Sequence, residues 1–239
     1  MEAGRVERPL GFAHRGARAD ARENTLEAFR LAVSLGATGI ESDVWLTADG
    51  RAALHHGPAV RLRRGGARQA ITSLAAARLP SYVPLLDDLY AACGVDLDLS
   101  LDLKDGRSAE AVLAVARAAG HDRSRLWLCA RGLEPLAWRG LDPDVRLVSD
   151  TRRLHVREHG WPAFLDQVRT GGGAAVNLRR RHWTRALVDH VHEHGLLAFA
   201  WDVQSTRRLQ RLLALGCDAV YSDHVRRLVP ALQGVSSRG

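Results

Sequence analysis

The side chains best suited to chemistry lie within residues 38–56. Glu41 and Asp43 stand near the end of a predicted strand, separated by one residue. Side chains two positions apart in a strand point to the same face, so both carboxylates can converge on one cation. A tight turn and a second extended run then lead to His55 and His56. Hard oxygen ligands and a titratable ring so close together predict a metal-binding or catalytic site.

These groups must be positioned by a regular alternation of strand and helix patterns. The predicted strands begin at Leu10, Thr38, Val95, Arg125, Val145, Ala174, Leu196 and Ala219, and the strand from Leu196 is expected to run to Val203. Helical spacing predicts helices over about 24–35, 85–93, 108–119, 134–139, 154–168, 183–194, 204–215 and 225–232. Alternation favours a parallel sheet, and eight units in a chain of 239 residues favour a single α/β domain, a (β/α)8 TIM barrel over 1–239. Residues 1–8 and 234–239 are expected to be tails.

Two segments of this pattern carry further predictions. Residues 57–84 read as the one long, loop-like connection, and we expect a small hairpin or lid there, after the second strand. Residues 95–104 alternate strictly, with leucines on one face and polar side chains on the other. In a barrel the leucines would face the outer helices, which places Asp102 and Lys104 in the lumen.

Composition narrows the possible classes of protein. The longest apolar runs are far shorter than a membrane span requires, and the first residues lack a signal-peptide pattern. Cys93, Cys129 and Cys217 lie far apart and read as reduced core residues, so we expect a cytoplasmic protein. The net charge of +7 favours an anionic partner. Lys104 is the only lysine beside 33 arginines, which indicates a position that needs a compact point charge.

In a TIM barrel the functional groups gather at the C-terminal ends of the strands. In this chain those ends carry His14, Arg15, Glu41, Asp43, His56, Asp102, Lys104, Trp201 and Asp223. Carboxylates such as Glu41, Asp43 and Asp102 suit Mg²⁺ or Ca²⁺. Two histidines suit proton transfer or nucleophilic attack, and cations such as Arg15 and Lys104 hold an anion. This combination predicts cleavage of a phosphodiester.

The same residues stand in recognisable motifs. They are His14-Arg15-Gly16, Glu23-Asn24-Thr25, Gly39 to Val44, Thr47 to Gly50, His56, Asp102-Leu103-Lys104, Trp201-Asp202-Val203 and Gly216 to Asp223. Through them the chain resembles the glycerophosphodiester phosphodiesterase family along nearly its whole length.

The resemblance implies a barrel enzyme that uses a divalent metal to hydrolyse glycerophosphodiesters to glycerol 3-phosphate and an alcohol. By position, it implies His14 and His56 as catalytic residues, Glu41, Asp43 and Asp102 as metal ligands, Arg15 and Lys104 at the phosphate, and Trp201 in the substrate pocket.

The chain departs from the family pattern at four positions. Arg22 replaces a usual proline, Gly57 replaces the aspartate that usually follows the second histidine, and Asp202 replaces a common threonine. Asp102 replaces a usual glutamate and is one methylene shorter. The related sphingomyelinase D-type phospholipases look similar in using an aspartate there.

Several alternatives stay open at this point. The substrates could be lysophospholipids instead of glycerophosphodiesters. The reaction could be that of a phospholipase D-like lyase, which leaves a cyclic phosphate. The chain could also be a noncatalytic protein that binds phosphorylated ligands. We expect a small-molecule partner, no nucleic acid, and at most weak contact with an anionic membrane. The choice of Mg²⁺ or Ca²⁺, the role of each histidine, and the oligomeric state remain open.

Overall fold

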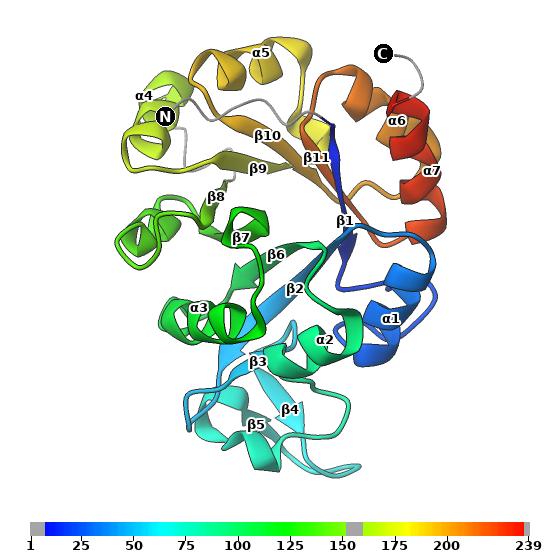
Figure 1. Cartoon of the computed structure of the whole chain (residues 1–239), viewed down its shortest axis with the longest axis vertical. Helices are drawn as coiled ribbons and strands as arrows, with labels where there is room; N and C mark the ends of the chain where they lie inside the picture. The colour runs from blue at the N-terminus through cyan, green and yellow to red at the C-terminus, as the bar shows by residue number, and fades with distance from the viewer. Residues whose placement is uncertain (1–7, 152–159, 237–239) are drawn as a thin grey trace.

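The computed structural model describes residues 8–151 and 160–236 of the chain. Its centre is a closed barrel of parallel strands, surrounded by helices (Figure 1). The barrel strands are β1 (Leu10–His14), β2 (Gly39–Leu46), β6 (Asp98–Leu103), β7 (Leu126–Arg131), β8 (Arg146–Asp150), β9 (Ala175–Arg179), β10 (Leu197–Trp201) and β11 (Ala219–Ser222). The predicted eight-stranded TIM barrel is confirmed.

Helices follow nearly every barrel strand. They are α1 (Leu26–Ser34), α2 (Leu86–Cys93), α3 (Ser108–Ala119), α4 (Gly160–Thr170), α5 (Arg185–Glu193), α6 (Thr206–Ala214) and α7 (Val225–Ser236). Thr25 caps α1, because its side-chain oxygen accepts a hydrogen bond from the backbone N–H of Ala28. Among the described residues, no helix is both long and apolar enough to cross a membrane.

Three details differ from the sequence-based expectation. The helix predicted after β7 is a 3-10 helix, η4 (Glu134–Trp138). The strand predicted over 196–203 ends earlier, because Asp202 adopts a positive φ of 65° that an extended strand excludes. The last helix continues to Ser236 and so includes part of the predicted tail. The start of the helix predicted over 154–168 lies outside the described residues, as do residues 1–7 and 237–239 of the two predicted tails.

The register of neighbouring strands brings the polar strand ends together. His14 of β1 pairs with Glu41 of β2, and Asp43 of β2 pairs with Asp102 of β6. Strand partners that point to the same face lie side by side in a sheet. The lumen therefore receives these four side chains at the same end of the barrel.

The core has one layer inside the barrel and another outside it. Inside, Phe12 stacks on Tyr221 with ring centroids 4.8 Å apart, and Trp127 and Phe199 pack beside them. Outside, apolar side chains of the strands pack against the helices, and the leucines of β6 belong to this layer, as predicted. The aromatic filling closes the lumen below its polar end.

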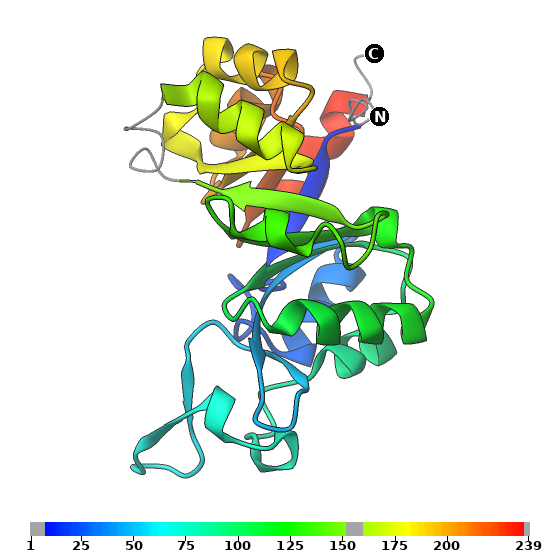
Figure 2. The ribbon, with the colours of Figure 1, turned by 90° about the vertical axis from the view of Figure 1, so that its left-hand side faces the viewer.

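An arm, residues 57–85, projects from the barrel after β2 and the short strand that follows it (Figures 1 and 2). β3 (Ala52–Leu54) pairs antiparallel with the end of β2, and the chain then forms the hairpin β4 (Ala59–Arg61) and β5 (Arg68–Ala70). Two short 3-10 helices, η1 (Ile71–Ser73) and η2 (Ala76–Arg78), complete the segment. The predicted small hairpin after the second strand is therefore present.

Close packing of β1 against β2 requires a glycine at position 39. A Cβ atom there would lie 2.6 Å from the backbone oxygen of Gly11. We predict that Gly39→Ala lowers the free energy of unfolding by about 1–3 kcal/mol, measured by urea denaturation, because the strands must separate to admit the methyl group. Gly140→Ala is the matched control, since no atom would lie within 4 Å of its Cβ. Equal stability of the two variants would contradict this packing argument.

Candidate active site

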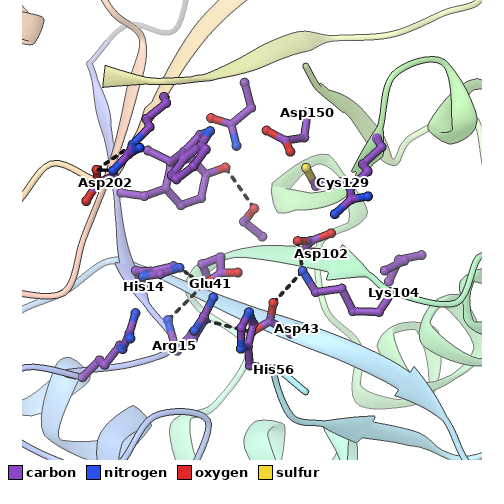
Figure 3. A pocket seen from close by; sticks show the side chains of 18 of the residues that line it. His14, Arg15, Glu41, Asp43, His56, Asp102, Lys104, Cys129, Asp150 and Asp202 are labelled. Atoms are coloured by element: carbon purple, nitrogen blue, oxygen red, sulfur yellow. Dashed lines mark hydrogen bonds and ion pairs between the residues drawn. The ribbon is translucent and has the colours of Figure 1, made fainter. Parts of the chain in front are cut away.

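A cavity of about 1050 Å³ opens at the C-terminal ends of the barrel strands (Figure 3). Its lining includes every residue for which the sequence predicted a site role: His14, Arg15, Glu41, Asp43, His56, Asp102, Lys104 and Trp201. The structure thus brings together the whole predicted set, from five separate segments of the chain.

His14 ends β1 and is held between two carboxylates. Its Nδ1 lies 2.6 Å from Oδ1 of Asp223, the residue that follows β11. Its Nε2 lies 3.8 Å from Oε2 of Glu41. Burial alone would raise the pKa of Asp223, but the hydrogen bond from His14 outweighs burial and the pKa is lowered. Asp223 is therefore the ionised acceptor of that hydrogen bond. Nε2 is then the nitrogen on the Glu41 side of the ring.

Arg15 joins the ends of the first two strands. Its backbone N–H donates to Oε2 of Glu41 at 2.9 Å, and its Nε lies 3.0 Å from Oδ2 of Asp43. Nη1 donates to Glu23 at 3.1 Å. Arg15 has a positive φ of 57°, an uncommon conformation for a residue with a side chain, and the carboxylate contacts hold it there.

Asn24 is a second anchor of the same carboxylate. Its Nδ2 donates to Oδ2 of Asp43 at 3.0 Å, and its Oδ1 accepts from the hydroxyl of Ser42 at 2.7 Å. The side chain is buried and the backbone has a φ of 54°. Asparagine tolerates this region better than most residues. The Glu23-Asn24-Thr25 motif therefore orients Asp43, a role that the sequence alone did not assign.

Lys104 connects the carboxylates of two strands. Its Nζ lies 2.8 Å from Oδ1 of Asp43 and also contacts Oδ2 of Asp102. Burial opposes the charged form of Lys104, yet the two carboxylates outweigh it and raise the pKa of the lysine. The only lysine of the chain thus places a compact ammonium in the lumen, as its retention predicted.

The two adjacent histidines have different surroundings. His56 lines the cavity, half of its side chain is exposed, and its Nδ1 lies 4.0 Å from Glu23. His55 is not part of the lining; its Nδ1 bonds the carbonyl of Gly57 and its ring faces Tyr82. Alternation along the strand predicts that the two rings lie on opposite faces, and of the two only His56, which the family resemblance implies, lines the cavity.

The opposite wall of the cavity is formed by the ends of β7 to β10. Trp201 lies there, and the guanidinium of Arg179 lies 5.6 Å from the centre of its ring. Arg179 also pairs with Asp202 at 2.8 Å. Asn177 contributes a buried Oδ1 that has no hydrogen-bond partner among the described residues. This wall presents an aromatic surface and polar groups to the cavity.

Burial and neighbouring charge shift the titration of the site in opposite directions. Burial, with further repulsion from Asp43, raises the pKa of Glu41. Burial also raises the pKa of Asp102, whereas Lys104 and Arg15 outweigh burial at Asp43 and lower its pKa. At His14 burial is outweighed by Glu41 and Asp223, and the pKa rises. Burial therefore disfavours the charged forms of Glu41 and Asp102, whereas the neighbouring cations favour the charged form of Asp43.

The carboxylates of the site are the residues that would hold a divalent cation. In the described part of the chain, no three His, Cys, Asp or Glu side chains are placed as they stand to hold a metal ion. Lys104 stands between Asp43 and Asp102 instead. The donors themselves are hard oxygens, the ligand type that Mg²⁺ and Ca²⁺ prefer, and Glu41, Asp43 and Asp102 line one cavity. The donor set therefore fits a hard divalent cation in its chemistry.

A closed parallel barrel with acids, histidines and cations at its C-terminal mouth defines a TIM-barrel enzyme. Comparison with known proteins agrees. The profile of the glycerophosphoryl diester phosphodiesterase family matches residues 14–107. The chain is 33% identical to the uncharacterized protein YqiK of Bacillus subtilis, over 89% of this chain and 93% of that protein. It is 25% identical to a glycerophosphodiester phosphodiesterase of Bacillus altitudinis, over 91% of this chain and 96% of that protein.

Solved structures share the fold. A glycerophosphoryl diester phosphodiesterase homologue from Silicibacter pomeroyi superposes with a TM-score of 0.82 at 22% identity, covering 98% of this chain and 96% of that one. A phosphodiesterase of Oleispira antarctica, in complex with the product sn-glycerol-3-phosphate, gives 0.81 at 20% identity, with coverage of 95% and 97%. The chain belongs to the glycerophosphoryl diester phosphodiesterase family. It is accordingly a phosphoric diester hydrolase.

The anchoring of Asp43 by Asn24 makes a prediction. Asn24→Ala removes two buried hydrogen bonds and puts alanine at a positive φ. We expect the free energy of unfolding to fall by about 2–4 kcal/mol in urea denaturation. The control is Asn177→Ala, the chain's other asparagine, whose Oδ1 has no partner within the described residues. If Asn24→Ala lowered the free energy of unfolding no more than Asn177→Ala does, the anchoring role of Asn24 would be refuted.

Proposed function

We propose that this chain is a divalent-metal-dependent phosphodiesterase. It hydrolyses glycerophosphodiesters to glycerol 3-phosphate and an alcohol, or lysophospholipids to the corresponding phosphomonoester and an alcohol. The observation that carries the proposal is that His14 and His56 line the same cavity as three carboxylates, Arg15 and Lys104. The glycerol 3-phosphate in the Oleispira antarctica relative supports the substrate class.

The histidines supply the proton transfers of the reaction. Asp223 holds Nδ1 of His14, so the ring is fixed in one orientation. One histidine protonates the leaving alcohol, and the other attacks phosphorus or activates water. His56 lacks the aspartate that usually follows it in the family. Its Nδ1 lies 4.0 Å from Oε1 of Glu23 instead.

The cations hold the phosphate and oppose the charge that develops on it. Arg15 and Lys104 stand beside the carboxylates in the lumen, within the same cavity as both histidines. Their charges are fixed before the substrate arrives, which is how electrostatic stabilisation is most effective. A divalent ion bound by Glu41, Asp43 and Asp102 would neutralise charge on the nonbridging oxygens. Trp201 covers the substrate from the opposite wall.

The roles of His14 and His56 can be tested with His55, the residue next to His56, as the control. We predict that His14→Ala and His56→Ala each reduce turnover of glycerophosphocholine by about a hundredfold to ten-thousandfold, measured by phosphorus NMR. His55→Ala should retain turnover, because its ring lies outside the cavity lining. Loss of activity in His55→Ala with full activity in His56→Ala would overturn the assignment.

The same NMR spectra separate hydrolysis from the lyase reaction. Hydrolysis of glycerophosphocholine or lysophosphatidylcholine gives a linear phosphomonoester, whereas expulsion of the alcohol by an internal hydroxyl gives a cyclic phosphate. Asp102 is the residue that raises the lyase alternative, because the related lyases have aspartate there. A cyclic product would replace the hydrolase proposal, and absence of turnover on every diester would favour a binding protein.

Metal dependence can be measured without relying on activity alone. We predict that EDTA abolishes turnover and that Mg²⁺ or Ca²⁺ restores it. Calorimetric titration of the metal-free protein should show divalent cation binding that Glu41→Gln weakens at least about tenfold, because a buried oxygen ligand loses its charge. Glu110→Gln, on the exposed face of α3, is the control. Equal cation binding by both variants would contradict the proposed role of Glu41.

A further inference from the structure

The arm, defined as residues 57–85, carries positive charge that the active site does not use. It contains no lysine, aspartate or glutamate and five exposed arginines: Arg61, Arg63, Arg64, Arg68 and Arg78. Within the described residues none of them pairs with a carboxylate. Arg61 and Arg68 donate instead to backbone carbonyls of their own hairpin. By contrast Arg51, just before the arm, pairs with Asp87 at 2.6 Å.

The hairpin places like charges opposite each other. Arg61 of β4 and Arg68 of β5 are direct partners in the antiparallel register, and Arg63 and Arg64 follow at the turn. Like charges in opposed positions of a strand pair destabilise it. An external anion would remove this repulsion, and no acidic side chain of the arm can do so.

A hollow on the arm has the chemistry of a phosphate-binding site. Its volume is about 370 Å³, and it is lined by Leu62, Arg63, Gly66, Ala67, Gln69 and Arg78. Two guanidinium groups suit a phosphate, which they can bind through paired N–H donors. Gln69 adds an amide, and Leu62 adds an apolar wall. The combination matches the phosphate of a lipid headgroup together with the apolar region next to it.

The arm is a folded platform beside the mouth of the active site. Val60, Ile71, Leu74 and Val83 are buried against one another and leave the arginines on the outside. Residues 57 and 58, at the root of the arm, line the catalytic cavity. A Cβ atom at Gly57 would lie 3.2 Å from Nη2 of Arg68, so the basic surface of the arm reaches the wall of that cavity at Arg68.

We propose that the arm docks on bilayers that contain anionic phospholipids, with a headgroup phosphate in the hollow between Arg63 and Arg78. Nucleic acid is the less suitable polyanion, because binding of single strands relies on exposed aromatic rings. The arm's one aromatic residue, Tyr82, is covered by the guanidinium of Arg22 at 3.6 Å from the ring centre. Docking on bilayers does not depend on the proposed function. Any increase that docking gives in the turnover of lysophospholipids does rest on the proposed function.

The test compares vesicle binding by variants of equal charge. Cosedimentation is measured with phosphatidylcholine vesicles that contain or lack phosphatidylglycerol. The wild type should bind only the anionic vesicles, and less so as NaCl rises. Arg63→Gln/Arg78→Gln should weaken this binding by about fivefold for each arginine, that is, about 25-fold. Arg207→Gln/Arg208→Gln on α6, at the other end of the molecule in Figure 1, is the matched control and should bind like the wild type.

Folding and activity controls keep the outcomes distinct. Arg63→Lys/Arg78→Lys should bind better than the glutamine variant, and turnover of water-soluble glycerophosphocholine should be the same in all variants. An equal loss of vesicle binding in the arm variant and the α6 variant would overturn the proposal, since binding would then depend on net charge alone. Tighter binding of a DNA oligonucleotide than of anionic vesicles, or full displacement from vesicles by millimolar inorganic phosphate, would also overturn it. Vesicle binding without turnover would leave docking intact and refute the proposed function.

Discussion

The structure of the active site depends on the burial of carboxylates at the open end of the barrel. Glu41 and Asp43 are almost inaccessible to solvent, and Asp102 lies beside them. Buried negative charges at such short range repel one another unless cations and hydrogen bonds compensate. Arg15 and Lys104 provide that compensation, from the ends of β1 and β6. Burial still raises the pKa of Glu41, and repulsion from Asp43 adds to that shift.

Barrel closure is what converts separate strand ends into one site. β1 pairs with β2 on one side and with β11 on the other, so His14 lies between Glu41 and Asp223. The aromatic packing of Phe12 and Tyr221 closes the lumen beneath these residues. A polar cavity above an apolar floor keeps the charged groups at the mouth, where a phosphodiester can enter.

Local pattern was sufficient for most of the fold, because strand and helix periods, and glycine and proline positions, are short-range properties. The strict alternation of residues 95–104 predicted which side of β6 faces the helices. The hairpin of the arm was less visible, because its strands are only three residues each and most of their side chains are exposed. The positive φ of Asp202, which ends β10 early, has no signal in the alternation of apolar residues.

The sequence by itself determined the chemical groups of the site, because residue type and two-residue spacing decide which side chains can share a face. Alternation put His55 and His56 on opposite faces, and the resemblance to the family favoured His56. Only the tertiary structure decided their partners. Asp223 was visible as a strand end, but its bond to His14 joins residues 209 positions apart. Asn24 was visible as part of a motif, but its hydrogen bond to Asp43 depends on how a loop folds over β2. The first contact arises from barrel closure and the second from the path of a loop, and sequence spacing encodes neither.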